Sequence, residues 1–387
     1  MDIMVIPFHD WRKSEKEGFR TRDVHFIRAL ANHKFSNRLL VINRPITKLE
    51  LVYKGFKKQL RGNIVLKAGK CTLTQVDTNI FVADYYSQDV IGQAAHRFKW
   101  FINAYNEDGY KDFIYNACSY LQFDNAKLLT QNIFAYKLAL SLSATNKVFD
   151  AWDNFLKFPG YSHLKKDLQL GYAEMSREIA SWTTNSNENI NFYKQNFKVK
   201  NIDLLKNGVK TDFAEGQFIL PQDLLSIKKP WIGFGGKISY LMDSELINYI
   251  SADNPDSSFI FVGQILDKRV YQKIIKRKNV FFLGDKKYDM YANYVKSFDI
   301  CIVPYNVKNK QHGGDSMKAY EYLLAKKKVV GTNGNGLEDL KDYIYVEDTP
   351  ENFSAQLKTL DNQKIELPIE QHSWLSKAQT LLCILDK

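Results

Sequence analysis

The segment FDICIVPYNVKNKQHGGDSMKAYEYLLAKKKVVGTN, residues 298–333, decides the fold class and the position of the candidate site. An apolar run that ends at Pro304 predicts a buried strand, and a polar loop with the pair Gly313-Gly314 follows it. A helix is expected to begin at Asp315 or Ser316, because both residue types cap helix N-termini. A second apolar run comes next, so the segment has the strand–helix–strand order of a parallel α/β sheet.

Lys318 and Glu321 are placed unusually for surface residues of this helix. A cation in the first turn is disfavoured by the helix dipole, and Lys before Glu is the weaker order for an ion pair. Both placements are explained if Lys318 contacts a phosphate and Glu321 accepts hydrogen bonds from ribose hydroxyls. Gly313 and Gly314 would then let the backbone approach the anion at the helix N-terminus. The alternative is a solvated pair above a core stripe of Met317, Tyr320 and Leu324.

The alternation of strands and helices extends along the whole chain, which predicts parallel sheets covered by helices on both faces. In the first half we expect strands over 3–7, 38–42, 63–67, 79–83, 127–132, 147–150 and 180–185. A second series is expected over 231–234, 258–262, 280–283, 298–304, 329–331 and 343–346. Sheets of this kind bind ligands outside the carboxyl ends of their strands.

The length of 387 residues exceeds one ordinary core and predicts two domains. We expect one Rossmann-like domain over residues 1–207 and a second Rossmann-like domain over 208–372. A C-terminal helix over 373–387 is expected to pack back towards the first domain. Asn207-Gly208 marks the crossing.

The composition is that of a globular protein, with 45% hydrophobic and 25% charged residues. No stretch approaches the roughly 20 apolar residues of a membrane span. The N-terminus MDIMVIPFHDW predicts a first strand rather than a signal peptide, and four scattered cysteines fit a reducing compartment. We therefore expect a cytoplasmic protein without a metal site built from cysteines.

The formal net charge is +11, and residues 1–70 hold 16 Lys or Arg against 6 Asp or Glu. A basic first domain fits a phosphorylated acceptor or an anionic membrane at the inner face. A solvated lysine-rich surface is the alternative. We expect no nucleic acid partner, because none of the usual recognition motifs is present.

The segment that begins at Asp315 resembles the donor-binding signature of GT-B glycosyltransferases. The family pattern N-P-L-K-x-Y-E-Y-L-A-x-G-K-P-V-V stands here as DSMKAYEYLLAKKKVV, residues 315–330. Upstream, NVFFLGDKKYDMYANYVKSFDICIVPY (279–305) resembles a second element of the family. VFDAWDNFLKFPG (148–160) and KNGVKTDF (206–213) resemble two more, and all four occur in the family's order.

The resemblance implies a metal-independent transferase, hexosyltransferase-like and of the retaining kind, with a nucleotide-diphosphate sugar as donor and no cofactor. It places the donor on residues of the second domain: Gly235, Gly236, Lys237, Gly263, Tyr288, Gly313, Gly314, Asp315, Ser316, Lys318 and Glu321. Lys237 and Lys318 would act in catalysis by stabilising the departing nucleoside diphosphate. Related retaining enzymes carry an acidic sugar contact eight positions before this Glu; here Gly313 occupies that position, so the sugar is not named.

The first domain is expected to supply the acceptor side. Asp150 and Asp153 follow a strand, where a carboxylate can act as a catalytic base or bind hydroxyls, with a structural cap as the alternative. The loop HDWRKSEKEGFRTRDVHF (9–26) resembles the family's acceptor-facing loop, which makes Arg20, Arg22 and His25 candidates for acceptor binding.

The sequence therefore favours a glycosyltransferase that modifies a glycan or lipid-linked oligosaccharide in surface polysaccharide biosynthesis. Two alternatives stay open. One is a nucleotide-sugar 2-epimerase of the same fold, and the other is a non-enzymatic two-lobed sugar-binding protein.

Overall fold

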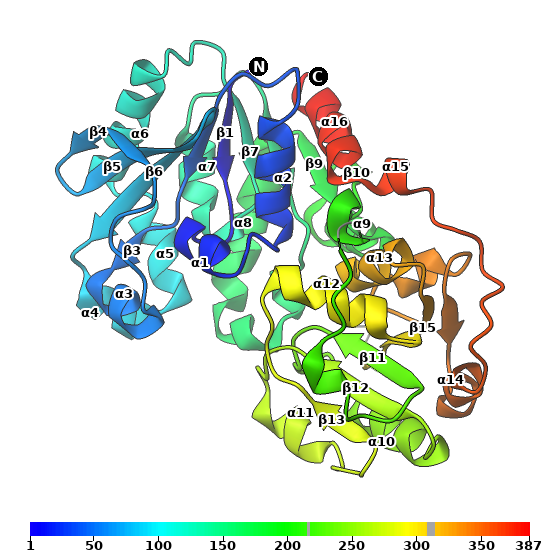
Figure 1. Ribbon diagram of the computed structural model, residues 1–387. Coiled ribbons are helices and arrows are strands. Elements are labelled where there is room, and N and C mark those ends of the chain that lie inside the picture. The colour runs from blue at the N-terminus through cyan, green and yellow to red at the C-terminus, as the bar shows by residue number, and fades with distance from the viewer. Residues whose placement is uncertain (215–216, 308–313) are drawn as a thin grey trace. The chain divides into compact units, whose positions relative to one another are not determined.

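The computed structural model describes residues 1–214, 217–307 and 314–387, and it divides the chain into two compact units (Figure 1). Unit 1 comprises Met1–Lys206 and Trp374–Lys387, and unit 2 comprises Asn207–Ser373. Each unit is built on a sheet that is wholly or mostly parallel and flanked by helices. The predicted class, two Rossmann-like α/β domains, is confirmed.

The sheet of unit 1 has the order β10-β9-β8-β7-β1-β2-β6-β5-β4, and β3 pairs with β6. Its strands are β1 (Ile3–Ile6), β2 (Leu39–Ile42), β3 (Ile46–Thr47), β4 (Asn63–Ala68), β5 (Cys71–Asp77), β6 (Ile80–Ser87), β7 (Lys127–Thr130), β8 (Lys147–Asp150), β9 (Ser181–Thr184) and β10 (Asn201–Leu204). Its helices are α1 (Trp11–Lys16), α2 (Arg22–Ala31), α3 (Lys48–Lys54), α4 (Val90–His96), α5 (Phe98–Ala104), α6 (Asp108–Tyr120), α7 (Tyr136–Ser141), α8 (Lys165–Glu178), α9 (Asn187–Phe197) and α16 (Trp374–Leu385).

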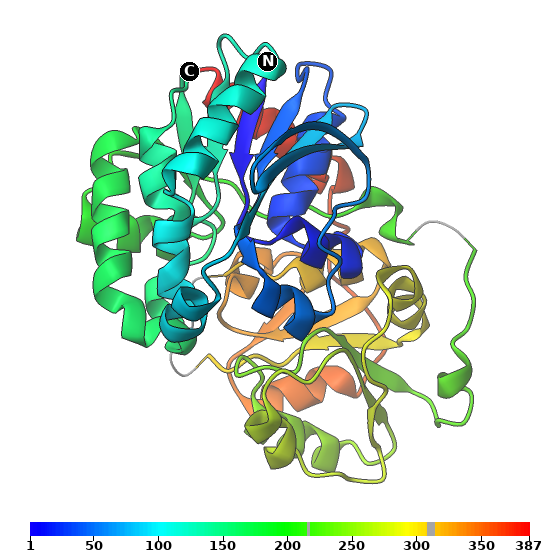
Figure 2. The same ribbon diagram turned by 90° about the vertical axis from the view of Figure 1, so that its left-hand side faces the viewer.

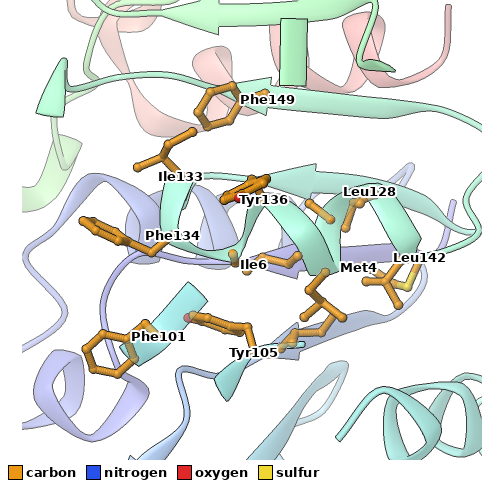
Figure 3. Packing of buried hydrophobic residues seen from close by; sticks show 14 of the residues in the cluster. Met4, Ile6, Phe101, Tyr105, Leu128, Ile133, Phe134, Tyr136, Leu142 and Phe149 are labelled. Carbon is orange, nitrogen blue, oxygen red and sulfur yellow. The ribbon is translucent and has the colours of Figure 1, made fainter. Parts of the chain in front are cut away.

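Strand β1 lies at the centre of this sheet and is buried on both faces, which explains its continuous apolar sequence. Met4 and Ile6 point to the face covered by α5, α6, α7 and α8, and Figure 3 shows them packed with Phe134 and Leu128. The opposite face carries α2 and α16, which pack against each other (Figures 1 and 2). The C-terminal helix thus completes unit 1.

An antiparallel hairpin at one edge of unit 1 was not expected from the sequence. β5 runs antiparallel to both β4 and β6. The β4–β5 connection is a two-residue turn in which Gly69 has a φ of +54°, a conformation that glycine adopts without a Cβ clash. The strand predicted over 63–67 is present as β4, but its partner Cys71–Asp77 was missed.

The sheet of unit 2 is parallel throughout and has the order β13-β12-β11-β14-β15-β16. Its strands are β11 (Trp231–Gly235), β12 (Ser258–Val262), β13 (Val280–Phe282), β14 (Ile300–Val303), β15 (Lys328–Thr332) and β16 (Tyr345–Glu347). Its helices are α10 (Ser244–Asp253), α11 (Lys268–Lys273), α12 (Tyr288–Ser297), α13 (Met317–Leu324), α14 (Pro350–Leu357) and α15 (Ile369–His372). Numbered in chain order, the strands follow 3-2-1-4-5-6, the order of dinucleotide-binding Rossmann domains.

None of the helices in the described part of the chain is long and apolar enough to span a bilayer.

Candidate active site

The strand order of unit 2 reverses between β11 and β14, and this is where doubly wound sheets bind ligands. β11 ends at Gly235 and is followed directly by Gly236 and Lys237. β14 leads through Pro304 towards α13, which begins at Met317. Most of the predicted donor residues therefore lie at the ends of the two central strands, while Gly263 follows β12 and Tyr288 follows β13.

The side chain of Lys318 crosses the backbone of Gly236. A Cβ atom on Gly236 would lie 1.9 Å from Lys318 Cε and 3.0 Å from its Nζ, so a side chain at position 236 would push the end of Lys318 out of this position. Gly263 approaches from the end of β12, and its Cβ would lie 2.0 Å from the Gly236 carbonyl oxygen. Lys318 Nζ also lies 5.8 Å from the ring centroid of Phe234 and 5.9 Å from that of Tyr305. Three predicted donor residues are thus brought together.

Gly235 is held in place by the buried Tyr322 and the half-buried Tyr291. Its N–H donates to the Tyr322 hydroxyl at 2.8 Å, and its carbonyl oxygen accepts from the hydroxyls of Tyr291 and Tyr322, each at 3.2 Å. Burial raises the pKa of both tyrosines well above the ordinary value, and the nearby charge of Glu321 acts in the same direction. Glu321 is only 6% exposed, so its carboxylate lies inside the site beside neutral phenols.

Asp315 anchors the start of unit 2 to the start of α13. Its carboxylate accepts from the Asn207 N–H at 2.6 Å and from the Tyr320 hydroxyl at 3.0 Å. The Asn207 side-chain amide donates to the Asp315 carbonyl oxygen at 2.7 Å. Because both carboxylate oxygens hold protein groups, Asp315 has a structural task at this position, and its predicted contact with the donor stays a prediction.

Two unsatisfied polar side chains lie near the N-terminus of α13. Ser316 occupies the N-cap position without a cap hydrogen bond, and its buried hydroxyl has no partner among the described residues. Asn335 is 5% exposed, and neither atom of its amide is hydrogen-bonded within the described part of the chain. The next residue, Gly336, packs on this segment, because its Cβ would lie 2.3 Å from the Gly314 carbonyl oxygen.

Asn335 was missed in the sequence, although the loop NGNG after the strand KVVGT gave a signal. Its φ is +55°, a left-handed conformation that Asn tolerates better than most residues. A buried amide without partners costs stability, so a ligand that pairs with it would remove that cost. Gly313 lies outside the described residues, and for Tyr288 the structure describes the backbone at the start of α12 but not the side chain.

In unit 1 the strand order reverses between β1 and β7, and a pocket of about 150 Å³ lies there. Its aromatic lining consists of Phe8, Phe98, Phe101, Phe134 and Tyr161. Its polar lining consists of His9, Asp10, Lys13, Arg44, Lys54 and Asn132. We call this the unit 1 pocket. Rings beside cationic side chains suit a sugar that carries an anionic group.

The His9 imidazole at this pocket is oriented by a buried carboxylate. Nδ1 lies 3.0 Å from Asp23 Oδ2, and the His9 backbone N–H donates to the same oxygen at 2.8 Å. Although burial raises the pKa of Asp23, its interactions with His9 and Thr21 hold it well below the ordinary value. The carboxylate therefore fixes the imidazole with Nδ1 turned inward.

Asp150 is held by four hydrogen bonds from buried side chains. Arg22 donates from Nε to Oδ2 at 3.0 Å and from Nη2 to Oδ1 at 2.9 Å. Gln131 and Thr183 each donate to the carboxylate at 2.8 Å. Arg22 also donates to the Leu205 carbonyl oxygen at 2.8 Å. The geometry is that of a structural ion pair, and the catalytic role predicted for Asp150 stays a prediction.

Asp153 is partly buried, and it lies three residues further along the chain. Burial raises its pKa to about 7, with Asp150 adding to the rise and Arg22 opposing it. A carboxyl group with this pKa can exchange a proton near neutral pH, as a general base must.

The predicted acceptor residues are not gathered at the unit 1 pocket. Arg22 is bound to Asp150 as described above. Arg20 pairs with Glu17 at 3.4 Å, and the His25 ring stacks on Trp374 with centroids 4.8 Å apart. The residues that do line the pocket, notably Lys13, Arg44 and Lys54, come from distant segments, which the sequence did not connect.

No family model matches the chain. Over 160 residues, 40% of this chain and 40% of the relative, it is 28% identical to TuaH of Bacillus subtilis (strain 168), described as a teichuronic acid biosynthesis glycosyltransferase. The match thus spans less than half of that relative's length.

Among solved structures the chain is similar to an α,α-trehalose 6-phosphate synthase of Burkholderia multivorans, with a TM-score of 0.63 and 11% identity over 99% of this chain and 94% of the other. It is also similar to Anabaena HepE in complex with UDP-glucose, with a TM-score of 0.63 and 12% identity over 100% of this chain and 99% of the other. These likenesses show the GT-B fold, and the proteins that share it here are glycosyltransferases.

Proposed function

We propose that this protein transfers a sugar from a nucleotide-diphosphate sugar to a glycan or lipid-linked acceptor in surface polysaccharide biosynthesis. The observation that carries the proposal is the crossing of Lys318 over Gly236 where the strand order of unit 2 reverses. A cation fixed over a glycine turn beside a helix N-terminus suits a diphosphate. The teichuronic acid relative supports the polymer class, and the neighbour bound to UDP-glucose supports the donor class.

In this proposal unit 2 binds the donor. Lys318, Lys237 and the first N–H groups of α13 contact the diphosphate, and Glu321 accepts hydrogen bonds from the ribose hydroxyls. Three glycines leave space for the groups around the site, because a Cβ atom at any of them would clash with a neighbouring residue: Gly235, Gly236 and Gly263. Ser316 and Asn335 supply neutral hydrogen-bonding groups for the donor, as expected of a site that recognises sugar hydroxyls.

The acceptor binds in unit 1. Rings of the unit 1 pocket contact the sugar, while Lys13 attracts an anionic group of the acceptor beside Arg44 and Lys54, which both pair with Glu50. With Nδ1 held by Asp23, His9 turns Nε2 towards an acceptor hydroxyl. Of the two predicted catalytic carboxylates, Asp153 suits proton transfer better, because the oxygens of Asp150 are occupied.

The transfer needs no metal ion in this proposal, because lysines and helix N–H groups meet the charge that develops on the leaving diphosphate. We infer retention of the anomeric configuration from the patterns shared with mostly retaining enzymes. NMR of the first-formed product decides this point: the anomer of the donor supports retention, and the opposite anomer excludes it.

Thermal unfolding with UDP-, GDP- and dTDP-sugars tests the donor class. A ligand that binds the folded state raises the melting temperature, and a hundredfold excess over Kd contributes about 2.7 kcal/mol. We expect one nucleotide class to stabilise the protein and free sugars to have no effect. Glu321→Gln and Lys318→Ala should each reduce the shift clearly, whereas Lys358→Ala, an exposed lysine of unit 2, should keep it. A response to free sugars alone would favour a binding protein, and isomerisation of the donor without acceptor would favour an epimerase.

A further inference from the structure

The most exposed large hydrophobic side chains of the described residues lie on two neighbouring helices of unit 1. Tyr53 is 87% exposed, Ile91 84% and Val52 73%. Tyr53 and Val52 belong to α3, and Ile91 belongs to α4. Figure 1 shows these helices side by side at one end of the unit.

The apolar residues of α3 form an outward face. Leu49, Val52 and Tyr53 follow the spacing i, i+3, i+4, which places them on one side of the helix. The same helix turns Leu51 and the charged Glu50 inward. This reverses the usual order of a surface helix, which buries apolar residues and exposes charges. In α4, Ile91, Ala94 and Ala95 repeat the spacing, and all three are exposed.

The two helices are fixed to each other by polar contacts beneath these faces. Gln93 donates to Glu50 at 2.8 Å and also bonds the Thr47 hydroxyl. Glu50 in turn pairs with Arg44 and Lys54. Because these inward polar groups are hydrogen-bonded or paired, α3 and α4 are held together with their apolar residues facing outward.

Basic residues predominate in the segment that carries the α3 face, while α4 has the exposed Asp89 at its N-cap. Residues 48–61 contain five Lys or Arg and a single acid, Glu50, which is buried and paired. Lys48, Lys57 and Lys58 are exposed. The loop that carries Lys57 and Lys58 is held by Arg12, whose guanidinium donates to both carbonyl oxygens and to Asp84. The backbone of the segment that carries Lys57 and Lys58 is therefore fixed, a few residues along the chain from Val52 and Tyr53.

We infer that this α3–α4 surface, made of Leu49, Val52, Tyr53, Ile91, Lys48, Lys57 and Lys58, binds an anionic lipid bilayer. Lysines meet the negative headgroups, and the apolar side chains enter the interface between headgroups and acyl chains. The inference goes beyond the transfer reaction, since lipid binding requires neither donor nor acceptor. It also gives the basic first 70 residues a function that nucleotide binding in unit 2 leaves unexplained.

Co-sedimentation of the full chain with vesicles tests the inference. We expect binding to vesicles of phosphatidylcholine with about one third phosphatidylglycerol, little binding to phosphatidylcholine alone, and weakening by salt. Combined Val52→Ser, Tyr53→Ser and Ile91→Ser should reduce binding at least about tenfold. Each of Lys48→Glu, Lys57→Glu and Lys58→Glu should reduce it about fivefold or more.

Matched controls lie on α8 of the same unit, where Leu170→Ser, Lys165→Glu and Lys166→Glu change exposed residues of the same kinds and should leave binding unchanged. Melting temperature and nucleotide-sugar binding should be unaltered in every variant, which separates failure of this inference from failure of the proposed function. The inference is overturned if the wild type stays in the supernatant with anionic vesicles, or if the surface variants bind as the wild type does. Self-association that the serine variants abolish, without vesicle binding, would instead assign the surface to a second copy of the chain.

Discussion

The side chain of Lys318 lies so close to Gly236 that a methyl group added to this glycine would clash with it. A Cβ on Gly236 would lie 1.9 Å from Lys318 Cε. The two residues are 82 positions apart in the chain and meet because β11 and β14 are neighbours in the sheet of unit 2. The contact fixes a cation at the carboxyl ends of these strands, where the fold binds its ligands.

Gly236→Ala should therefore displace the Lys318 ammonium and weaken donor binding by about tenfold or more, the amount that one charge-assisted hydrogen bond contributes. Isothermal titration with the donor measures this. Gly69→Ala is the matched control, because Gly69 also has a positive φ but open space around it. If both variants bind the donor equally well, the crossing of Lys318 over Gly236 has no functional importance.

Arg22→Ala should cost about 3–5 kcal/mol of the free energy of unfolding, because it leaves the Asp150 carboxylate buried without its cation. Arg20→Ala, which removes a partly exposed partner of Glu17, should cost less than about 1 kcal/mol. Urea titration followed by tryptophan fluorescence reports mainly on unit 1, since five of the six tryptophans lie there. Equal losses in the two variants would contradict the structural role of the Arg22–Asp150 pair.

Asp153 should make the protein less stable as the pH rises. Its pKa is raised from 3.8 to about 7, so between these values the folded state binds more protons than the unfolded state. Asp153→Asn removes this dependence and should gain stability relative to the wild type between pH 5 and pH 8, by at most about 3 kcal/mol. Urea titrations at the two pH values measure the difference. An Asp153→Asn curve parallel to the wild type would exclude the raised pKa.

Asn335→Gly keeps the left-handed backbone of this position and removes the unpaired amide. We expect the free energy of unfolding to change by less than about 1 kcal/mol, because loss of a buried unsatisfied group offsets the entropic cost of glycine. Donor affinity should fall by about tenfold if the amide pairs with the donor. Titration of the variant with the donor distinguishes this role from a purely structural one, which would leave affinity intact.

The strands of both units were largely predictable, because runs such as Phe298–Pro304 and Ser258–Val262 are apolar apart from Asp299 and Ser258 and are bounded by turn residues. The glycines at the ends of β11 and β12 were likewise predicted, as donor-binding residues. β5 was missed because Cys71–Asp77 mixes apolar and polar residues, and its pairing depends on neighbours on both sides.

The partners of charged residues could not be predicted in the same way. Arg22 meets Asp150 across 128 positions, and Asp315 meets Asn207 across 108. The unit 1 pocket is lined by residues from segments between Phe8 and Tyr161, and no local sequence pattern predicts that these segments lie together. The resemblance identified the donor signature, whereas the unit 1 pocket could be identified only from the fold.

Release of nucleoside diphosphate from the stabilising nucleotide sugar tests the central claim most directly, measured for the wild type and for Lys318→Ala combined with Glu321→Ala. The proposed donor site predicts release by the wild type and a rate at least about a hundredfold lower in the double variant, since both phosphate and ribose contacts are lost. Near-normal release by the double variant would contradict a donor site centred on α13.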